Sequence, residues 1–306
     1  MTVVVLGIFV ADTAYRADRL PRMGETILGR HFALGPGGKG SNQAVAAARA
    51  GGRVHLITRI GADPFGAMGH RLWDEAGVHP AVTEDPDSFT GAAFIFLDHA
   101  TGQNAIIVCP GAAERLDEGD VDRHADLIAG ARVFLTQLEQ PLAAARRGLQ
   151  IARAAGVTTI LNPAPAMPLP AGLLPLCDII TPNETEAQAL TGLPVTTPDQ
   201  AAAAAAALRA MGARAACITL GPAGALWQDD TGTLRVPGIP MPDVVDTVGA
   251  GDAFNGALAT ALAQGRPPEQ ALRFANAAAA ISVTRPGAAS SSPARAEIEA
   301  LLARQP

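Results

Sequence analysis

The sequence of 306 residues is poor in aromatic side chains and carries no excess of positive charge. Aromatic residues make up 4% of the chain, and its formal net charge at pH 7 is −6. Proteins that bind nucleic acid rely on clustered basic side chains and on aromatic faces for base stacking. We therefore expect no nucleic-acid partner. The 48% of hydrophobic residues beside 17% of charged residues also argues against disorder.

Long apolar runs are absent too. The first run, Thr2 to Ala11, is too short to span a bilayer, and it has neither a basic leader nor a site that resembles a signal cleavage site. We interpret it as a buried strand. The chain is accordingly expected to be cytoplasmic and to have no membrane partner.

Cysteine is scarce and odd in number. Cys109, Cys177 and Cys217 are widely spaced, and each lies in or beside an apolar run. Such positions predict buried, reduced thiols rather than a disulfide framework. No spacing of cysteine and histidine suggests a zinc site.

What the chain does contain is a repeated alternation of apolar strands and amphipathic helices, without a linker rich in Pro or Ser. This alternation predicts a mostly parallel central sheet with helices on both faces, in a single α/β domain over residues 1–306. The predicted strands are Val3–Val10, Val54–Ile60, Val133–Leu138, Thr158–Leu161, Asp178–Thr181 and Ala216–Leu220. The predicted helices are Gly40–Ala50, Pro64–Glu75, Leu142–Ala155, Glu184–Leu190, Pro198–Met211 and Ala253–Gln264.

Two regions interrupt the alternation, at about residues 13–34 and 91–108 within the domain. Tyr15–Leu34 and Ala92–Val108 contain short strand-like pieces without an intervening helix, and the second has a turn around Asp98–Gln103. They predict a small accessory sheet, which could cover a site as a lid or pair with its counterpart in a second subunit. The alternative is a pair of hairpins at the sheet edge without such a role.

The stretch Asp246–Asp252 is the strongest candidate for a catalytic element. Glycines before a helix let a ligand approach the backbone, and the start of a helix offers free N–H groups and positive potential to a phosphate. Asp252 lies beside that seat, where a carboxylate could take the proton of a hydroxyl as a phosphoryl group arrives. The alternative is a helix entry rich in glycine, with Asp252 as its capping residue.

A second Gly-rich stretch, Gly35–Asn42, precedes the predicted helix Gly40–Ala50. It is not a Walker A loop, because Lys39 is followed by Gly40 rather than by Ser or Thr. A Gly-Gly turn lets backbone N–H groups reach a small polyhydroxylated ligand, and Lys39 and Asn42 can donate to its hydroxyls. The alternative is a turn followed by an ordinary helix start.

Polar side chains also follow several of the predicted strands. Asp12 follows the first strand, Glu139 follows Val133–Leu138, and Asn183 with Glu186 follows Asp178–Thr181. Ligands of open parallel sheets bind beyond the carboxyl ends of the strands. We therefore expect these side chains to converge on one rim, although each alone would more often be a solvated loop residue or a cap.

Taken together, these stretches resemble the ribokinase-like, or PfkB, family of sugar kinases, nearly from end to end. The resemblance implies a three-layer α/β/α fold with a small β-sheet lid. The motifs that carry it are Gly24-Glu25-Thr26, Gly37-Gly38-Lys39-Gly40-Ser41-Asn42-Gln43, Gln137-Leu138-Glu139, Leu161-Asn162-Pro163-Ala164-Pro165-Ala166, Thr181-Pro182-Asn183-Glu184-Thr185-Glu186, Thr219-Leu220-Gly221, Asp246-Thr247 and Gly249-Ala250-Gly251-Asp252.

The resemblance implies an enzyme that transfers the γ-phosphoryl group of ATP to the 5-hydroxyl of D-ribose, with Mg²⁺ on the nucleotide. Asp252 would be the base, and Gly249, Ala250 and Gly251 would form the anion hole. An aspartate at a helix start is expected to be ionised at neutral pH, so that it takes up the proton as the new bond forms.

The family pattern implies further sites and a homodimer joined through the lids. The sugar would contact Asp12, Gly38, Lys39, Asn42, Glu139 and Asp252. The nucleotide would lie along Asn183, Thr219, Gly221, Gly224, Gly251 and Asn276, with Glu186 organising Mg²⁺ indirectly. A monovalent cation, K⁺, would be held by Asp246, the carbonyl of Val248, Arg285, Gly287 and Ser292.

One position departs from the family pattern. Ribokinases usually carry Asn two residues before the sugar-binding Asp, whereas this chain has Val10, which cannot bond a hydroxyl. A site that lacks such a contact discriminates less against a sugar without the hydroxyl. Kinases of 2-deoxyribose, of another furanose or of a ketose are therefore the alternative. A sugar sensor without turnover is a third interpretation, against which the intact Asp252 argues.

Overall fold

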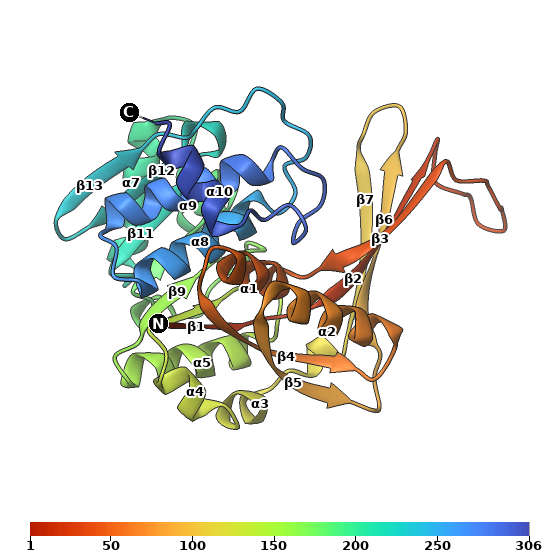
Figure 1. Ribbon diagram of the computed structural model, residues 1–306, viewed down its shortest axis with the longest axis horizontal. Coiled ribbons are helices and arrows are strands. Elements are labelled where there is room, and N and C mark those ends of the chain that lie inside the picture. Colours follow the sequence, from red (N-terminus) through yellow and green to blue (C-terminus); the bar gives the residue numbers. More distant parts are fainter. Residues whose placement is uncertain (306) are drawn as a thin grey trace.

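The computed structural model describes residues 1–305 and consists of a large α/β/α body with a smaller sheet at one side (Figure 1). The large sheet has the strand order β13-β12-β11-β10-β9-β8-β1-β4-β5, and its strands from β11 to β5 run parallel. These strands are β1 Thr2–Leu6, β4 Arg53–Gly61, β5 Val78–Asp85, β8 Val133–Thr136, β9 Thr158–Leu161, β10 Ile179–Ile180, β11 Ala215–Thr219, β12 Ala225–Asp229 and β13 Gly232–Val236.

Helices cover both faces of this sheet, as predicted. Alternate strand residues point to opposite faces: Val3 and Val5 pack in one core cluster, and Val4 and Leu6 in the other. The first face is covered by α1 Lys39–Arg49, α2 Pro64–Ala76, α8 Ala250–Ala263, α9 Pro268–Ser282 and α10 Arg295–Leu302. The second is covered by α3 Glu118–Asp122, α4 Ala125–Ala129, α5 Leu142–Ala154, α6 Glu184–Thr191 and α7 Pro198–Ala210. Short 3₁₀ turns are η1 Ala112–Arg115, η2 Leu174–Leu176 and η3 Gly221–Ala223.

The first predicted strand, Val3–Val10, is wrong at its C-terminal end. β1 stops at Leu6, and a new strand begins at Val10 in the other sheet. The break lies where helix α1 begins against Gly7: a Cβ on Gly40 would lie 2.5 Å from the Gly7 Cα. Asp12, expected in a loop after the first strand, is therefore part of the small sheet.

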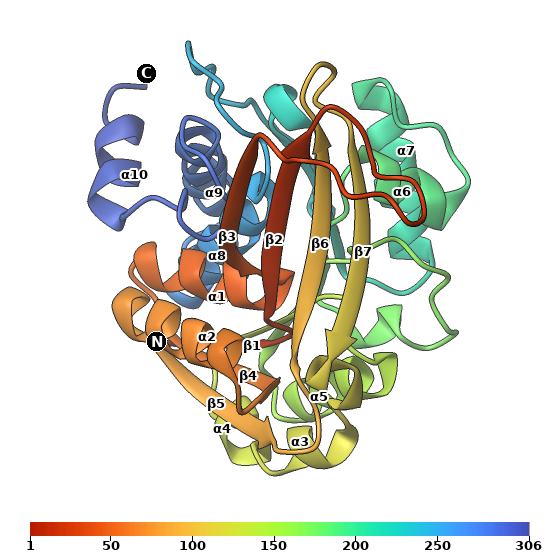
Figure 2. The ribbon, with the colours of Figure 1, turned by 90° about the vertical axis from the view of Figure 1, so that its right-hand side faces the viewer.

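The predicted accessory sheet is confirmed as a four-stranded sheet with the order β3-β2-β6-β7, seen face-on in Figure 2. Its strands are β2 Val10–Ala17, β3 His31–Gly37, β6 Thr90–Asp98 and β7 Asn104–Gly111. The predicted turn between β6 and β7 is closed by the Asp98 backbone N–H, which donates to the Gln103 carbonyl at 2.8 Å. We refer to these four strands as the lid sheet.

The prediction of buried thiols holds for Cys177 and Cys217 but is wrong for Cys109, which is exposed. Cys109 lies opposite Ala92 in β7, which is an edge strand of the lid sheet and is exposed over most of its length. All three thiols are free. None of the helices within residues 1–305 is long and apolar enough to cross a lipid bilayer.

Candidate active site

The start of helix α1 carries the first two site residues. Gly38 precedes the helix with φ 87°, and a Cβ there would lie 2.5 Å from the Ile8 carbonyl oxygen, so glycine is required. Gly38 has no side chain to cap the helix. The Glu139 carboxylate, which follows β8, accepts instead from the Lys39 backbone N–H at 2.7 Å. A helix start thus holds a carboxylate supplied by a distant strand end.

Asp252 lies in the first turn of α8, which begins three residues earlier than the predicted Ala253. The N-cap is Gly249, with φ 78°, so the alternative in which Asp252 caps the helix is wrong. Asp252 is 7% exposed. Its two oxygens accept from two consecutive residues of α1: Oδ2 from Asn42 Nδ2 at 3.0 Å, and Oδ1 from Gln43 Nε2 at 2.9 Å.

Buried charges around Lys39 shift one another's pKa. Burial raises the pKa of Asp252 above its usual range, and Lys39, Gln43 and Asn42 partly offset that rise. Burial raises the pKa of Glu139 to about 7, against the pull of Lys39. Burial lowers the pKa of Lys39, but the nearby carboxylates outweigh it and leave the pKa raised. The expected ready ionisation of Asp252 at a helix start therefore competes with desolvation, which sequence alone did not indicate.

Asp12 reaches the same region from the lid sheet. Its carboxylate lies against Gly37, where a Cβ would collide with both of its oxygens. Burial raises the pKa of Asp12 to about 6. Asp12 and Asp252 both raise the pKa of Glu139 electrostatically, so the lid sheet and the two helix starts face a common space.

Asn183 and Glu186 form a reciprocal cap at the start of α6. Asn183 N–H donates to Glu186 Oε2 at 2.9 Å, and Glu186 N–H donates to Asn183 Oδ1 at 2.8 Å. Burial raises the pKa of Glu186, and both Lys39 and Asp252 influence it, which brings this element toward the same centre. Asn183 also forms a bridge with Thr219, the last residue of β11.

Three further predicted nucleotide-binding residues, Gly221, Gly224 and Asn276, lie near the chain segments that follow Thr219. Gly221 begins η3 with φ 51°, and Gly224 ends it with φ 97°. A Cβ on Gly224 would collide with the Val236 carbonyl oxygen. Asn276 Nδ2 donates to the carbonyls of Val236 and Pro237, each at 3.1 Å, and Asn276 also lines a cavity of about 280 Å³.

The candidate cation residues are only partly brought together. Asp246 accepts from the Val248 N–H at 2.9 Å and from the Gly287 N–H at 3.0 Å, so it joins two loops beside the start of α8. Arg285 turns to an ion pair with Glu297. The Ser292 carbonyl accepts from Arg49 Nη1 at 3.0 Å. Within residues 1–305, no group of three or more His, Cys, Asp and Glu side chains could hold a metal ion.

Several residues of the site were not predicted as functional. Gln43 bonds both Asp252 and Asn162, and Gln137 bonds Gln43. All three lie in motifs that support the family resemblance, but nothing local in the sequence says that their amides meet. Besides those motifs, the sequence signal is that Gln137 lies near the end of the predicted strand Val133–Leu138 and Asn162 directly after Thr158–Leu161.

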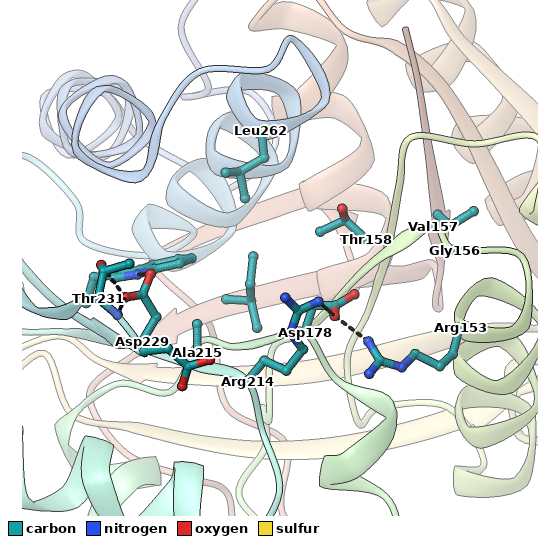
Figure 3. A pocket seen from close by; sticks show the side chains of 13 residues that line it. Arg153, Gly156, Val157, Thr158, Asp178, Arg214, Ala215, Asp229, Thr231 and Leu262 are labelled. Carbon is teal, nitrogen blue, oxygen red and sulfur yellow. Dashed lines mark hydrogen bonds and ion pairs between the residues drawn. The ribbon is translucent and has the colours of Figure 1, made fainter.

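A cavity of about 620 Å³ lies elsewhere (Figure 3). It is at the amino-terminal edge of β9, β10 and β11, opposite the strand ends that carry Glu139 and Asn183. Its polar groups are paired with one another: Asp178 binds both Arg153 and Arg214, and Trp227 Nε1 donates to Asp229. None of the predicted site residues lines it.

The chain is similar to known carbohydrate kinases over nearly its whole length. Residues 1–295 match the family of pfkB carbohydrate kinases. The chain is 40% identical to a ribokinase of Haemophilus influenzae over 97% of this chain and 96% of that protein. It is 36% identical to a deoxyribokinase of Salmonella typhi over 96% of each. The structure of Arabidopsis thaliana ribokinase complexed with ribose and ATP superposes with a TM-score of 0.96 at 34% identity, covering 99% of both chains.

Proposed function

The chain belongs to the pfkB family of carbohydrate kinases, and from that membership we propose that it transfers the γ-phosphoryl group of ATP to the 5-hydroxyl of D-ribose, giving D-ribose 5-phosphate. One observation carries the proposal beyond the family likeness. Asp252 is buried at a helix start, and its oxygens are held by α1 beside Lys39. This is the arrangement that deprotonation of a hydroxyl next to an arriving phosphoryl group requires.

In this proposal the 5-hydroxyl loses its proton to Asp252 while its oxygen bonds to the γ-phosphorus and ADP leaves. The raised pKa of Asp252 favours that proton uptake. The N–H groups at the start of α8, from Gly249 to Gly251, stabilise the charge on the transferred group. The anionic side chains Asp12 and Glu139 accept from the other sugar hydroxyls, and Lys39 and Asn42 donate to them.

Two ions fit the donor atoms of the site, in different degrees. Mg²⁺ prefers oxygen ligands and keeps several waters, so Glu186, beside Asn183, is suited to hold it through water on the nucleotide phosphates. K⁺ would use the Asp246 carboxylate and the Val248 carbonyl. Arg285 and Ser292 fit less well, because the Arg285 side chain is itself a cation, paired with Glu297, and the Ser292 carbonyl is directed at the Arg49 guanidinium.

The proposal is tested by ADP release from ATP with D-ribose, 2-deoxy-D-ribose, D-fructose and adenosine, with Mg²⁺ and with K⁺ or Na⁺. We expect the highest kcat/KM on ribose and a rise with K⁺. Asp252→Asn should abolish turnover and leave ribose binding measurable by calorimetry. Ribose binding without turnover in the unmodified protein would instead support a sensor.

A preference for 2-deoxyribose is the second candidate, and Val10 is the observation that favours it. Val10 is 6% exposed and packs with Ile8 and Ala113, two residues before Asp12 on the same strand face. An apolar side chain there offers no partner to a sugar hydroxyl. A kcat/KM at least as high on 2-deoxyribose as on ribose would make 2-deoxyribose the preferred substrate and leave the proposed mechanism unchanged.

We also propose a cytoplasmic homodimer, joined through the outer face of the lid sheet. This outer lid face consists of Tyr15, Phe32, Leu34, Phe94 and Ile107, which the strand register brings to one side. Tyr15, Phe32, Leu34 and Ile107 are exposed in the single chain. Large exposed apolar patches mark association sites. Analytical ultracentrifugation should find a dimer, which Phe32→Asp dissociates and which Leu28→Asp, outside the sheet, leaves intact.

A further inference from the structure

A chain of buried amides connects the ends of two central strands to Asp252. Gln137, just beyond β8, donates from Nε2 to Gln43 Oε1 at 2.6 Å. Gln43 Nε2 then donates to Asp252 Oδ1 at 2.9 Å and to Asn162 Oδ1, just beyond β9, at 3.0 Å. Both hydrogens of the Gln43 amide are therefore used, and one of them is directed at the carboxylate.

The orientation of the Gln43 amide is determined by a backbone group. Asn162 Nδ2 donates to the Thr181 carbonyl at 2.9 Å. A carbonyl can only accept, so the Asn162 nitrogen must face Thr181 and the Asn162 oxygen must face Gln43. That oxygen in turn requires a donor, so the Gln43 amide must direct its nitrogen at it. Flipping the Gln43 amide would turn its oxygen toward two acceptors, Asn162 Oδ1 and the Asp252 carboxylate. The network therefore holds a donor against Asp252.

Water cannot easily replace that donor. Gln43 and Gln137 are fully buried, and Asn162 is 6% exposed. Burial is also what raises the pKa of Asp252, and the bond from Gln43 opposes it. In a low-dielectric site, a hydrogen bond to an ionised group is stronger than in water. Removing the Gln43 amide should thus change the protonation of the Asp252 carboxylate more than the position of the Asp252 main chain.

The end of a third strand, β10, is connected to the main chain of helix α8 rather than to the Asp252 carboxylate. Thr181 Oγ1 donates to Asn255 Oδ1 at 2.6 Å, and Asn255 Nδ2 donates to the Gly251 carbonyl at 2.9 Å. The first turn of α8 is thereby tied to β10. Asp252 is held by its main chain from one side and by its side chain from the other.

We propose that Gln43 is a positioning residue for Asp252: its amide N–H, oriented by Gln137 and Asn162, holds the carboxylate in place and keeps it ionised for the reaction. The role of Asp252 in that statement rests on the proposed function. The bond from Gln43 and its effect on Asp252 do not.

Two variants at this position separate charge from packing. Gln43→Met keeps the approximate length of the side chain and removes the donor. Gln43→Glu keeps the shape and places a second carboxyl against Asp252. Gln140→Met is the control, because it removes another buried amide, whose donor contacts Thr136 and the Gln137 carbonyl rather than Asp252.

We expect the acid limb of kcat/KM with ribose to move to higher pH by about one to two units in Gln43→Met, and further in Gln43→Glu. The KM for ribose should change less than threefold, because the side-chain hydrogen bonds of Gln43 go to Asp252, Asn162 and Gln137 and to none of the other sugar-site candidates. Gln140→Met should leave the acid limb in place. A uniform loss of activity at every pH, without that order, would overturn the proposal.

A readout without turnover makes the test independent of the substrate. In protein labelled with ¹³C at the aspartate carboxyl carbon, the resonance that disappears in Asp252→Asn reports its titration. That titration should move upward in Gln43→Met and stay in place in Gln140→Met. An unmoved Asp252 titration refutes the role of Gln43, whereas a moved titration without sugar-dependent turnover refutes only the proposed function.

A further variant covers the case in which Gln43→Met does not fold. Gln137→Met removes the donor that orients Gln43, and the Gln137 Oε1 that it also removes is a buried atom without a hydrogen-bond partner. It also leaves the buried Gln43 Oε1 without a donor, so it should cost some stability, but it spares the bond from Gln43 Nε2 to Asp252. A smaller upward shift of the Asp252 titration supports the proposal, and no shift contradicts it.

Discussion

One guanidinium holds the loop that packs against the proposed anion hole. Arg49, the last residue of α1, directs Nη1 at the carbonyls of Ala289, Ser290 and Ser292, at 3.3, 3.0 and 3.0 Å. The same loop approaches the α8 N-cap so closely that a Cβ on Gly249 would lie 2.6 Å from the Ala288 Cα. Arg49→Met should therefore loosen both the loop and the helix start.

The size of the effect follows from the hydrogens available. Nη1 carries two hydrogens and faces three carbonyls, so the contacts amount to two charge-assisted bonds, each worth about 1.5–3 kcal/mol. Ser290 is exposed, and its carbonyl can bond water once Arg49 is gone. We expect Arg49→Met to lower the free energy of unfolding by about 2–4 kcal/mol. Displacement of the anion hole should lower kcat by about 10- to 100-fold.

Urea unfolding followed by circular dichroism gives the first quantity, and steady-state kinetics gives the second. Arg295→Met is the matched control, because Arg295 is exposed and its bond to Glu299 is an i,i+4 surface pair worth about 0.3–0.5 kcal/mol. A loss below about 1 kcal/mol in Arg49→Met, together with an unchanged kcat, would show that the guanidinium does not hold the loop.

Three further predictions concern substrate choice, pH and the anion hole. Val10→Asn should raise the ratio of kcat/KM for ribose over 2-deoxyribose about tenfold or more, and an unchanged ratio would remove Val10 from the specificity argument. The pKa of Glu139, raised to about 7, means that the KM for ribose should rise as pH falls below 7. Between the usual glutamate pKa of 4.5 and the raised pKa of about 7, the native state of the unliganded protein binds more protons than the unfolded chain. The free energy of unfolding should therefore fall as pH rises toward 7, and urea titrations should find a weaker fall in Glu139→Gln. Gly249→Ala places a side chain at a left-handed φ and against Ala288, and it should lower kcat about 100-fold or more. Gly77→Ala is the control: its φ of 72° is similar but the space around it is open, so it should lose stability without losing turnover.

Elements with strong local signals could be predicted from the sequence. The predicted strand Thr158–Leu161 coincides with β9, and the predicted helix Pro64–Glu75 differs from α2 by one residue. Helix α2 has its own start and stop: Asp63 accepts from the Gly66 N–H at 2.8 Å, and Gly77 ends the helix in the left-handed conformation. Where the signal is local, the prediction holds.

Elements determined by distant contacts could not be predicted. The run from Val3 to Val10 is apolar throughout, so nothing local separates β1 from β2, and the break comes from the approach of Gly40 to Gly7. Strand β5 contains Pro80, which argues against a strand. The proline is tolerated because β5 is the edge strand of the large sheet. The family resemblance supplied the site residues individually, but not the bonds among them.

The buried amides also explain how the fold tolerates several buried carboxylates in one site. Asp12, Glu139, Asp252 and Glu186 all have raised pKa values because burial disfavours their charged forms, and Lys39 is the cation that offsets three of them. Such a cluster costs folding free energy unless it is held by dipoles that cannot turn away. The amides of Asn42 and Gln43 are such dipoles, since both lie on one helix and act on both oxygens of Asp252. The ends of the central strands therefore serve the chemistry by fixing the direction of hydrogen bonds, which neither composition nor periodicity can specify.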